Sequence, residues 1–343
     1  MFGEPKRRRL LWMGASVLVL ALAAASLSWG SVHIPLGHVW EVMTGQGDHA
    51  MAEAILLNFR LPKLLTAMLA GAALSVSGLQ MQTLFRNPLA GPFVLGISSG
   101  ASLGVALLLM GGYLFSGAWA QYSSAWVALA ASVGAGVVFL LIMLISLRIR
   151  DAMTLLIVGL MVGSASSSIV SIVQYFSEAQ QIKAYLIWTF GSLGGLSWAE
   201  LGWLAPLVLV GLGISVLLIK PLDALLLGEN YARSLGVRIL RVRLGVVFST
   251  ALLAGSVTAF CGPIGFLGLA VPHLVRLVLG TNRHAQVLPA SIVLGMALLL
   301  LCDLIAQLPG QDTTLPINAI TALFGAPVVI WLIIRKPHLN RVF

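Results

Sequence analysis

The feature that most constrains this chain is a series of apolar stretches, each about 20 residues long, that recurs along the sequence. The first runs from Leu10 to Trp29 and the last from Ile317 to Ile334. An α-helix rises about 1.5 Å per residue, so about 20 residues cross the roughly 30 Å hydrocarbon core of a membrane. The stretches are continuously apolar rather than alternating, which indicates helices and not the strands of a barrel.

The composition excludes an ordinary soluble domain. Of 343 residues, 59% are hydrophobic and only 9% are charged, whereas a soluble domain carries about a quarter charged residues. The first stretch follows the basic segment Lys6–Arg9 and resembles a secretory signal. Because its apolar part is longer than that of a signal peptide and many more stretches follow, it is expected to remain as the first membrane helix.

We therefore predict an all-α polytopic membrane protein with about ten transmembrane helices in a single domain, residues 1–343. Three segments lie between spans: 31–59 outside, 177–196 outside with a re-entrant half-helix at Tyr185–Phe190, and the charged cytoplasmic segment 221–243. The ten spans are expected near residues 10–29, 60–85, 93–111, 125–147, 152–175, 199–219, 240–260, 264–279, 285–308 and 317–335.

The basic residues indicate how the chain is oriented. The net charge is +9, but the lysines and arginines lie between apolar runs rather than in one patch, which argues against nucleic acid as a partner. With ten spans and a cytoplasmic N-terminus, all but Arg60, Lys63 and Lys183 of the 20 basic residues lie in the cytoplasm. The positive-inside rule therefore predicts that both termini are cytoplasmic.

Two local patterns are each open to two explanations. Arg60 and Lys63 either extend toward lipid phosphates or bind acidic residues of an external protein. On the fifth span, the hydroxyls on one helix face either line a path for a hydrated substrate or bond back to the i−4 carbonyl at a tight interface. That face is formed by Met153, Ile157, Ser164, Ser168, Ser171 and Tyr175.

Several patterns that suggest other chemistry are better explained by packing. Gly100–Gly104 fits G-x-S-x-G around Ser102, with His273 on a later span, but a nucleophile elbow needs a strand–turn–helix context that a membrane helix lacks. Gly100 and Gly104 themselves have the spacing of closely packed helices. Cys261 and Cys302 lack a metal-type spacing. His33, His38 and His49 are expected to be solvated, so no metal or haem site is predicted.

Beside these patterns, a series of motifs runs in order through the chain. They begin with Arg60-Leu61-Pro62-Lys63 and include Leu227–Gly236, and together they resemble the FecCD family of permeases from iron-siderophore, haem and vitamin B12 importers. The matching segments are 60–63, 71–72, 86–92, 95–101, 188–193, 227–236, 262–269, 271–276 and 323–327.

The resemblance implies a type II ABC importer permease fold, a homodimer, and a place in the bacterial inner membrane. Two separate ATPase subunits would bind ATP and Mg, so this chain would be neither an enzyme nor the holder of a cofactor. A periplasmic or surface-tethered binding protein would deliver the substrate. An iron–siderophore is expected first, with haem and cobalamin after it.

The resemblance also implies roles for particular residues. Arg60 and Lys63 would dock the binding protein. Independently of the resemblance, the helical spacing on the fifth span makes Ser164, Ser168, Ser171 and Tyr175 the candidate lining of the translocation path. Asn87 and Leu89, with Met153 and Thr154, would form the cytoplasmic gate. The segment Pro221–Gly236 would couple to the ATPase, with Asp223 capping a short helix and Ala232 and Gly236 leaving a small face for a cleft. Its coupling residues would be Leu225, Leu226, Gly228, Glu229, Ala232, Leu235 and Gly236.

Two positions depart from the family pattern: Gln307 stands where an arginine is common, and Asn318 where a glycine is. Asp303, which lies in a span, is expected to have a structural role. The alternative function is an ion-coupled secondary transporter. It is disfavoured because charges avoid the middle of the spans, while the absence of a G-x-x-x-x-G-K-[ST] loop means that an ABC importer needs a separate ATPase.

Overall fold

The computed structural model describes residues 5–30, 32–45, 50–111, 123–149, 151–307 and 314–335. Of the residues discussed above, His49 and the terminal basic residues after Arg335 lie outside these ranges, as do the side chains of Lys6–Arg9. The described part is helical and contains no β-strand. Its helices are α1 Pro5–Ser28, α2 Leu36–Thr44, α3 Ala50–Ile55, η1 Leu56–Arg60, α4 Leu61–Leu84, η2 Pro92–Leu95, α5 Ile97–Met110, α6 Ser124–Arg148, α7 Ala152–Tyr175, α8 Ala179–Thr189, α9 Trp198–Leu217, α10 Ile219–Leu226, α11 Glu229–Ser234, α12 Ile239–Thr250, η4 Ala251–Gly255, α13 Ser256–Cys261, α14 Leu267–Leu279, α15 His284–Ala306 and α16 Ile317–Arg335.

The all-α, many-span prediction is confirmed. Among the described residues, 7 helical stretches are long and apolar enough to cross a membrane, and three shorter apolar helices occupy the remaining predicted positions. The shorter ones are Ile97–Met110, Leu267–Leu279 and Ile317–Trp331. The number ten stays a prediction, because α5 and α14 are shorter than a full crossing needs.

One predicted span differs in detail because a glycine breaks it. The predicted helix 93–111 divides into the 3₁₀ turn η2 and the helix α5. Between them, Gly96 adopts a φ of 74°, a left-handed conformation that glycine takes without steric penalty. A Cβ there would also lie 3.0 Å from the carbonyl oxygen of Gly159, so the turn brings η2 against α7.

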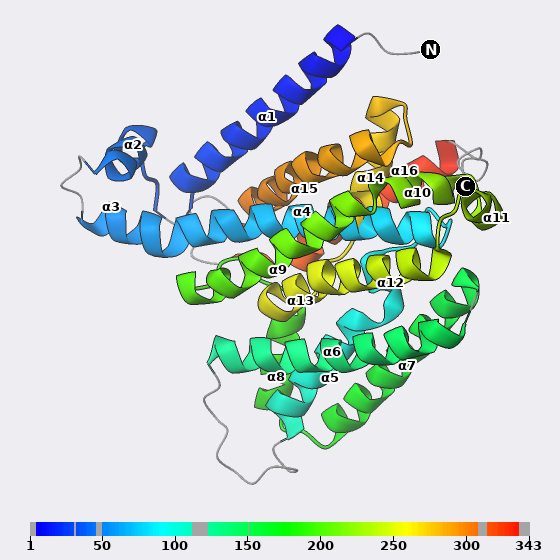
Figure 1. Ribbon diagram of the computed structural model, residues 1–343. Helices are drawn as coiled ribbons and strands as arrows, with labels where there is room; N and C mark the ends of the chain where they lie inside the picture. Colours follow the sequence, from blue (N-terminus) through cyan, green and yellow to red (C-terminus); the bar gives the residue numbers. More distant parts are fainter. Residues whose placement is uncertain are drawn as a thin grey trace.

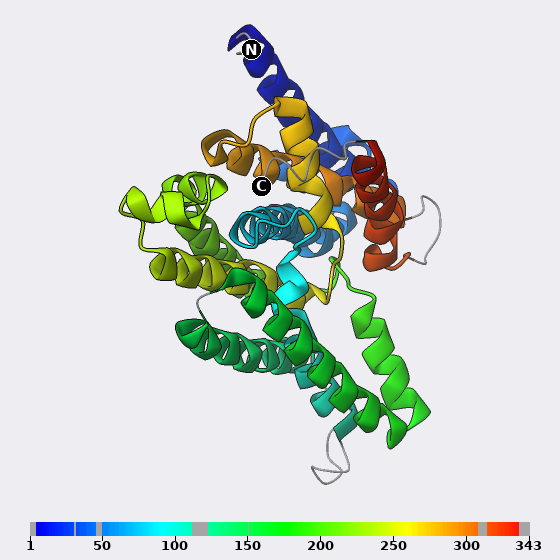
Figure 2. The same cartoon turned by 90° about the vertical axis from the view of Figure 1, so that its right-hand side faces the viewer.

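Helix α4 forms the centre of the bundle (Figure 2), where it is viewed nearly end-on with helices on every side. Nearly all of its residues are buried, including Gln80 and Gln82. Glycines allow its neighbours to approach closely: a Cβ on Gly71 would lie 2.3 Å from the oxygen of Gly295, and one on Gly78 would lie 1.9 Å from the oxygen of Gly268. Small residues thus bring α15 and α14 against α4.

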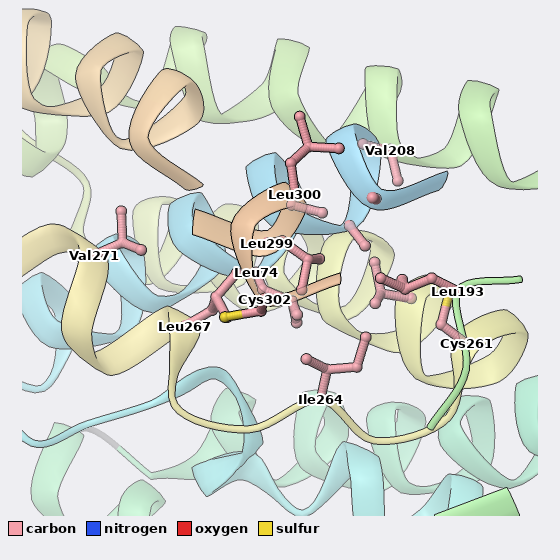
Figure 3. Close-up of a cluster of buried hydrophobic side chains, with 14 of the residues drawn as sticks. Leu74, Leu193, Val208, Cys261, Ile264, Leu267, Val271, Leu299, Leu300 and Cys302 are labelled. Atoms are coloured by element: carbon pink, nitrogen blue, oxygen red, sulfur yellow. The ribbon is translucent and has the colours of Figure 1, made fainter. Parts of the chain in front are cut away.

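The main apolar core surrounds α4 (Figure 3). Leu74 of α4 lies among Leu267 of α14 and Leu299 and Cys302 of α15. Cys261 belongs to the same core, and both cysteines are free and buried. Their assignment as small packing residues is confirmed.

The segments between spans lie at opposite ends of the bundle (Figure 1). Helices α10 and α11 lie at the right-hand end, together with the end of α16. Helices α2 and α3 lie at the opposite end. The segments 31–59 and 221–243 are therefore on opposite sides, as the alternation of spans predicts.

Candidate coupling segment, inner gate and outer surface

The predicted coupling segment folds as a hairpin of two short helices, α10 and α11. Gly228 separates them with a φ of 104°, which favours glycine at this position. One side of the hairpin packs inward through Leu222, Leu225 and Ala232. The opposite side exposes Leu227, Tyr231 and Leu235. We call these three exposed residues the apolar ridge.

The burial of Ala232 corrects the predicted insertion face. Ala232 is 0% exposed and Leu225 is also buried, so neither side chain is available to a partner. Gly236, in contrast, is exposed, and a Cβ there would meet nothing within 4 Å. The sequence suggested a small surface at Ala232 and Gly236, but helix α11 turns the first of them toward the core and the apolar ridge outward.

Asp223 also differs from the prediction, because it caps a distant helix instead of a local one. Its Oδ1 accepts hydrogen bonds from the backbone N of His284 and from its Nδ1, both at 2.7 Å. The Nε2 of His284 lies 2.9 Å from Oγ1 of Thr83 near the end of α4. Burial raises the pKa of Asp223, but the hydrogen bonds from His284 outweigh it and hold that pKa below its ordinary value. Asp223 thereby ties α10 to the first turn of α15.

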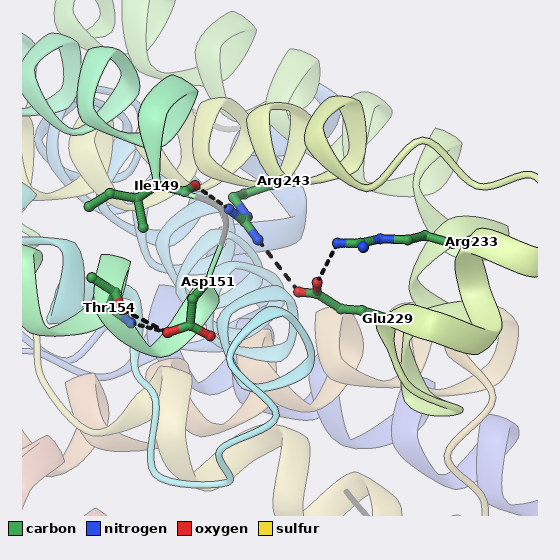
Figure 4. Close-up of polar contacts among 6 residues, drawn as sticks. All are labelled: Ile149, Asp151, Thr154, Glu229, Arg233 and Arg243. Atoms are coloured by element: carbon green, nitrogen blue, oxygen red, sulfur yellow. Dashed lines mark hydrogen bonds and ion pairs between the residues drawn. The ribbon is translucent and has the colours of Figure 1, made fainter.

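A second polar cluster connects α11 to the α6–α7 connection (Figure 4). The Nη1 atom of Arg243 donates to the carbonyl oxygen of Ile149 at 2.7 Å, and its Nη2 lies 3.4 Å from Oε1 of Glu229. The other oxygen of Glu229 lies 3.4 Å from Nη2 of Arg233. The sequence analysis gave Arg243 no role. The sequence feature that could have identified it is its position as a cation inside the apolar run Ile239–Cys261, because such a cation needs a partner.

The first half of the predicted gate is a tight turn after α4. The Oδ1 of Asn87 accepts a hydrogen bond from the backbone N of Leu89 at 2.9 Å, and the Nε2 of His273 lies 2.7 Å from the oxygen of Pro88. Arg86 adopts a φ of 47°, which is uncommon for a residue with a side chain. Leu89 is exposed. The turn is thus held from both sides while Leu89 projects outward.

The second half of the predicted gate is the first turn of α7. Asp151 caps this helix, accepting hydrogen bonds from the N of Thr154 at 2.7 Å and from its Oγ1 at 2.8 Å. These bonds lower the pKa of Asp151. Met153 is exposed beside the cap. Because η2 packs on Gly159 of the same helix, the two halves lie on adjoining segments, and their joint action as a gate stays a prediction.

The hydroxyl face of α7 combines the i−4 hydrogen bonds of one earlier explanation with exposure on the single chain. Ser164, Ser168 and Ser171 bond to the carbonyl four residues before them, each at 3.0 Å. All three are nevertheless exposed on the single chain, as is Tyr175. A hydroxyl that donates back to its helix keeps its acceptor lone pairs, so this face presents acceptors outward. A role in translocation stays a prediction.

Arg60 corrects the prediction of an isolated outer cation. Its guanidinium is buried and donates to the carbonyl oxygens of Leu27, Ser28 and Val32. Carbonyls at a helix C-terminus have no partner within the helix, and Arg60 supplies donors to the end of α1. Its side chain is not available to bind an external protein in the described structure.

Lys63 is likewise paired within the chain. Its Nζ lies 3.0 Å from Oδ1 of Asp303, and Nε2 of Gln307 donates to Oδ2 of the same aspartate at 2.7 Å. The structural role expected for Asp303 is confirmed, and Gln307 has a defined contact here. Asn318, the second departure, accepts a hydrogen bond at its Oδ1 from the N of Gly265 at 2.9 Å.

The residues of the G-x-S-x-G pattern have separate partners. The Oγ of Ser102 lies 2.5 Å from the hydroxyl of Tyr185 on α8, whereas His273 contacts Pro88. Gly104 packs at the α5–α6 interface, since a Cβ there would lie 2.1 Å from the oxygen of Ala130. The packing explanation for this glycine is confirmed.

Comparison with known proteins agrees with this arrangement. The chain matches the FecCD transport family over residues 18–335. It is 35% identical over 321 residues to the hemin transport system permease protein HmuU of Yersinia pestis, covering 93% of this chain and 94% of that protein. It is 37% identical over 333 residues to the vitamin B12 import system permease protein BtuC of Klebsiella pneumoniae, covering 96% of each.

A solved structure shares the fold. An inward-facing structure of a metal-chelate type ABC transporter superposes with a TM-score of 0.83 at 28% identity, covering 95% of this chain and 99% of that one. The helical bundle and its short-helix hairpin define a class, the membrane-spanning permease subunit of an ABC importer. Within that class the chain belongs to the FecCD transport family.

Proposed function

We propose that this protein carries a metal–tetrapyrrole chelate, haem or cobalamin, across the bacterial inner membrane, powered by ATP hydrolysis in two partner subunits. The relatives named for hemin and for vitamin B12 support this substrate class. For this reason we propose a tetrapyrrole ahead of the iron–siderophore that the sequence suggested first. The exposed acceptors of α7 suit a large polar chelate better than a bare ion.

The apolar ridge carries the proposal of an ATPase partner. Leu227, Tyr231 and Leu235 are exposed on a segment that lies outside the candidate membrane spans. Large apolar side chains gathered on a surface facing water mark a protein interface. In an ABC importer, the ATPase subunit is the partner at this end of the permease.

The remaining assembly follows the family. Two copies would meet along the exposed face of α7, so that Ser164, Ser168 and Ser171 of both copies border one path. Both termini would be cytoplasmic, on the same side as α10 and α11. A binding protein would dock on the opposite side. Of the three cations predicted there, Lys183 is the exposed one, and it replaces Arg60 as the docking candidate.

The direct test is reconstitution in proteoliposomes with the ATPase subunit and the binding protein. Uptake of hemin, cyanocobalamin and a ferric siderophore is measured with ATP and without it. We expect ATP-dependent uptake of one tetrapyrrole. Uptake of only the siderophore would overturn the substrate class, and uptake driven by an ion gradient without ATPase would overturn the importer assignment.

The interface is tested separately by changing the apolar ridge. Leu227→Ser with Leu235→Ser is expected to reduce copurification of the ATPase subunit at least tenfold. Met43→Ser, at an exposed site on α2 at the opposite end, serves as the control and should leave copurification unchanged. Equal copurification for both variants would remove the ridge from the interface.

A further inference from the structure

Among the residues whose side chains the structure describes, Arg243 is the largest that is almost fully buried, with 2% exposed. Withdrawing a guanidinium from water is costly unless its N–H groups find acceptors. Here the acceptors come from two distant segments, the carbonyl of Ile149 and the carboxylate of Glu229. A single buried side chain of α12 therefore connects two elements that are far apart in the sequence (Figure 4).

The two connected elements are the ones that the proposed mechanism must join. Glu229 is the first residue of α11, next to Gly228 at the break of the coupling hairpin. Ile149 directly follows α6, and Asp151, two residues later, caps α7. The first turn of α7 carries Met153 and Thr154, the predicted second half of the gate. Arg243 thus lies between the ATPase-facing hairpin and one side of the inner mouth.

The chemistry of arginine suits a rigid connection. Its guanidinium is planar and holds its donors in a fixed fork, whereas a lysine ammonium is a single point charge on a flexible stem. Its Nη1 atom donates to the carbonyl oxygen of Ile149, and its Nη2 atom donates to the carboxylate of Glu229. A displacement of Glu229 therefore moves the guanidinium and with it the Ile149 carbonyl.

The chain supplies an internal comparison in Arg233. This residue lies 3.4 Å from the same carboxylate of Glu229, but it is 57% exposed. Exposed ion pairs contribute little, typically less than about 1 kcal/mol. Arg233 and Arg243 share a partner and differ in burial, and of the two it is Arg243 that also bonds to Ile149.

We propose that Arg243 is a positioning residue that transmits movement of α11 to the first turn of α7 and so couples ATP hydrolysis to the inner gate. The inference rests on the proposed function, in which an ATPase moves the coupling hairpin. Beyond that function, the inference identifies Arg243 as the side chain that transmits the movement.

The test uses the reconstituted complex with ATPase, binding protein and substrate, and measures molecules transported per ATP hydrolysed. Arg243→Gln is expected to lower this ratio at least tenfold while the ATPase subunit still copurifies. Arg241→Gln, at an exposed position on the same helix two residues before Arg243, is the control and should keep the ratio of the unmodified protein. Loss of packing alone would lower the amount of folded complex without changing the ratio.

A second variant guards against misfolding at the buried site. Glu229 is partly exposed, so Glu229→Gln should fold and still lower the transport-to-ATP ratio. If the two residues act through one connection, the double variant should be no worse than Arg243→Gln alone. An unchanged ratio in Glu229→Gln, or additive losses in the double variant, would overturn the inference. A complex in which even the unmodified protein fails to transport would instead overturn the proposed function.

Discussion

The Nζ of Lys63 on α4 lies 3.0 Å from Oδ1 of Asp303 on α15. The aspartate is buried and the lysine is largely covered, so removal of one partner leaves a charge without its counterion in a region of low polarity. Breaking a buried pair in this way costs about 3–5 kcal/mol.

We therefore expect Lys63→Met to destabilise the protein by up to about 3 kcal/mol, since the lysine keeps some exposure. The measurement is unfolding in mixed micelles with increasing denaturing detergent. Lys63→Met combined with Asp303→Leu should recover much of the loss. Lys183→Met, an exposed control, should change stability by less than about 0.5 kcal/mol. Equal costs at Lys63 and Lys183 would contradict the pairing.

The α5–α6 interface offers a pair of glycines two residues apart on one helix. A Cβ on Gly134 would lie 2.1 Å from the oxygen of Gly100, whereas one on Gly136 would meet nothing within 4 Å. Gly134→Ala should force the helices apart and cost about 1–3 kcal/mol. Gly136→Ala should be neutral or stabilising by up to about 1 kcal/mol. The measurement is the thermal unfolding midpoint of each purified variant. Similar midpoints for the two variants would argue against close packing at Gly134.

The buried position of Ala232 changes what a bulky substitution there would do. Ala232→Trp inserts a large ring where the side chain is 0% exposed, so it should disrupt the hairpin itself rather than only exclude a partner. Leu235→Trp, at a residue 59% exposed, should leave the hairpin intact. Limited proteolysis of residues 221–236 provides the measurement. Rapid cleavage in Ala232→Trp alone is expected, and equal resistance would contradict the burial.

The contact between Asp223 and His284 predicts a pH dependence of stability. The folded state holds the pKa of Asp223 below its ordinary value, so the ionised form stabilises the fold above the unfolded pKa of about 3.9. This contribution disappears as the pH falls through the folded pKa. The unmodified protein should therefore exceed Asp223→Asn in stability at pH 7, and the difference should shrink progressively as the pH falls below about 4.

Unfolding midpoints measured from pH 7 to pH 3 provide this comparison. Glu53→Gln on the exposed side of α3 is the control and should follow the unmodified protein throughout. A difference between the unmodified protein and Asp223→Asn that persisted undiminished at the lowest pH would show that the carboxylate charge is not its cause.

The sequence alone determined where the helices lie and on which ends the connecting segments fall. The span predicted at 60–85 is α4, Leu61–Leu84, and the one predicted at 152–175 is α7, Ala152–Tyr175. These predictions succeed because length and apolarity are local properties: a segment of the right length must be helical to satisfy its own backbone in a membrane. The family motifs were also visible without a structure.

What only the tertiary structure decided is which polar groups meet and which small residues are hidden. Arg60 donates its hydrogen bonds to carbonyl oxygens at the end of α1, and the side chain of Ala232 is buried in the core. Arg243 contacts both Ile149 and Glu229. Each outcome depends on the rotation of one helix against neighbours that come from distant parts of the chain. Hydrophobic periodicity is too weak to specify that rotation on nearly uniformly apolar membrane helices, and α11, with 6 residues, is too short to show a clear period. Close packing and the need of each buried charge for a partner specify it instead.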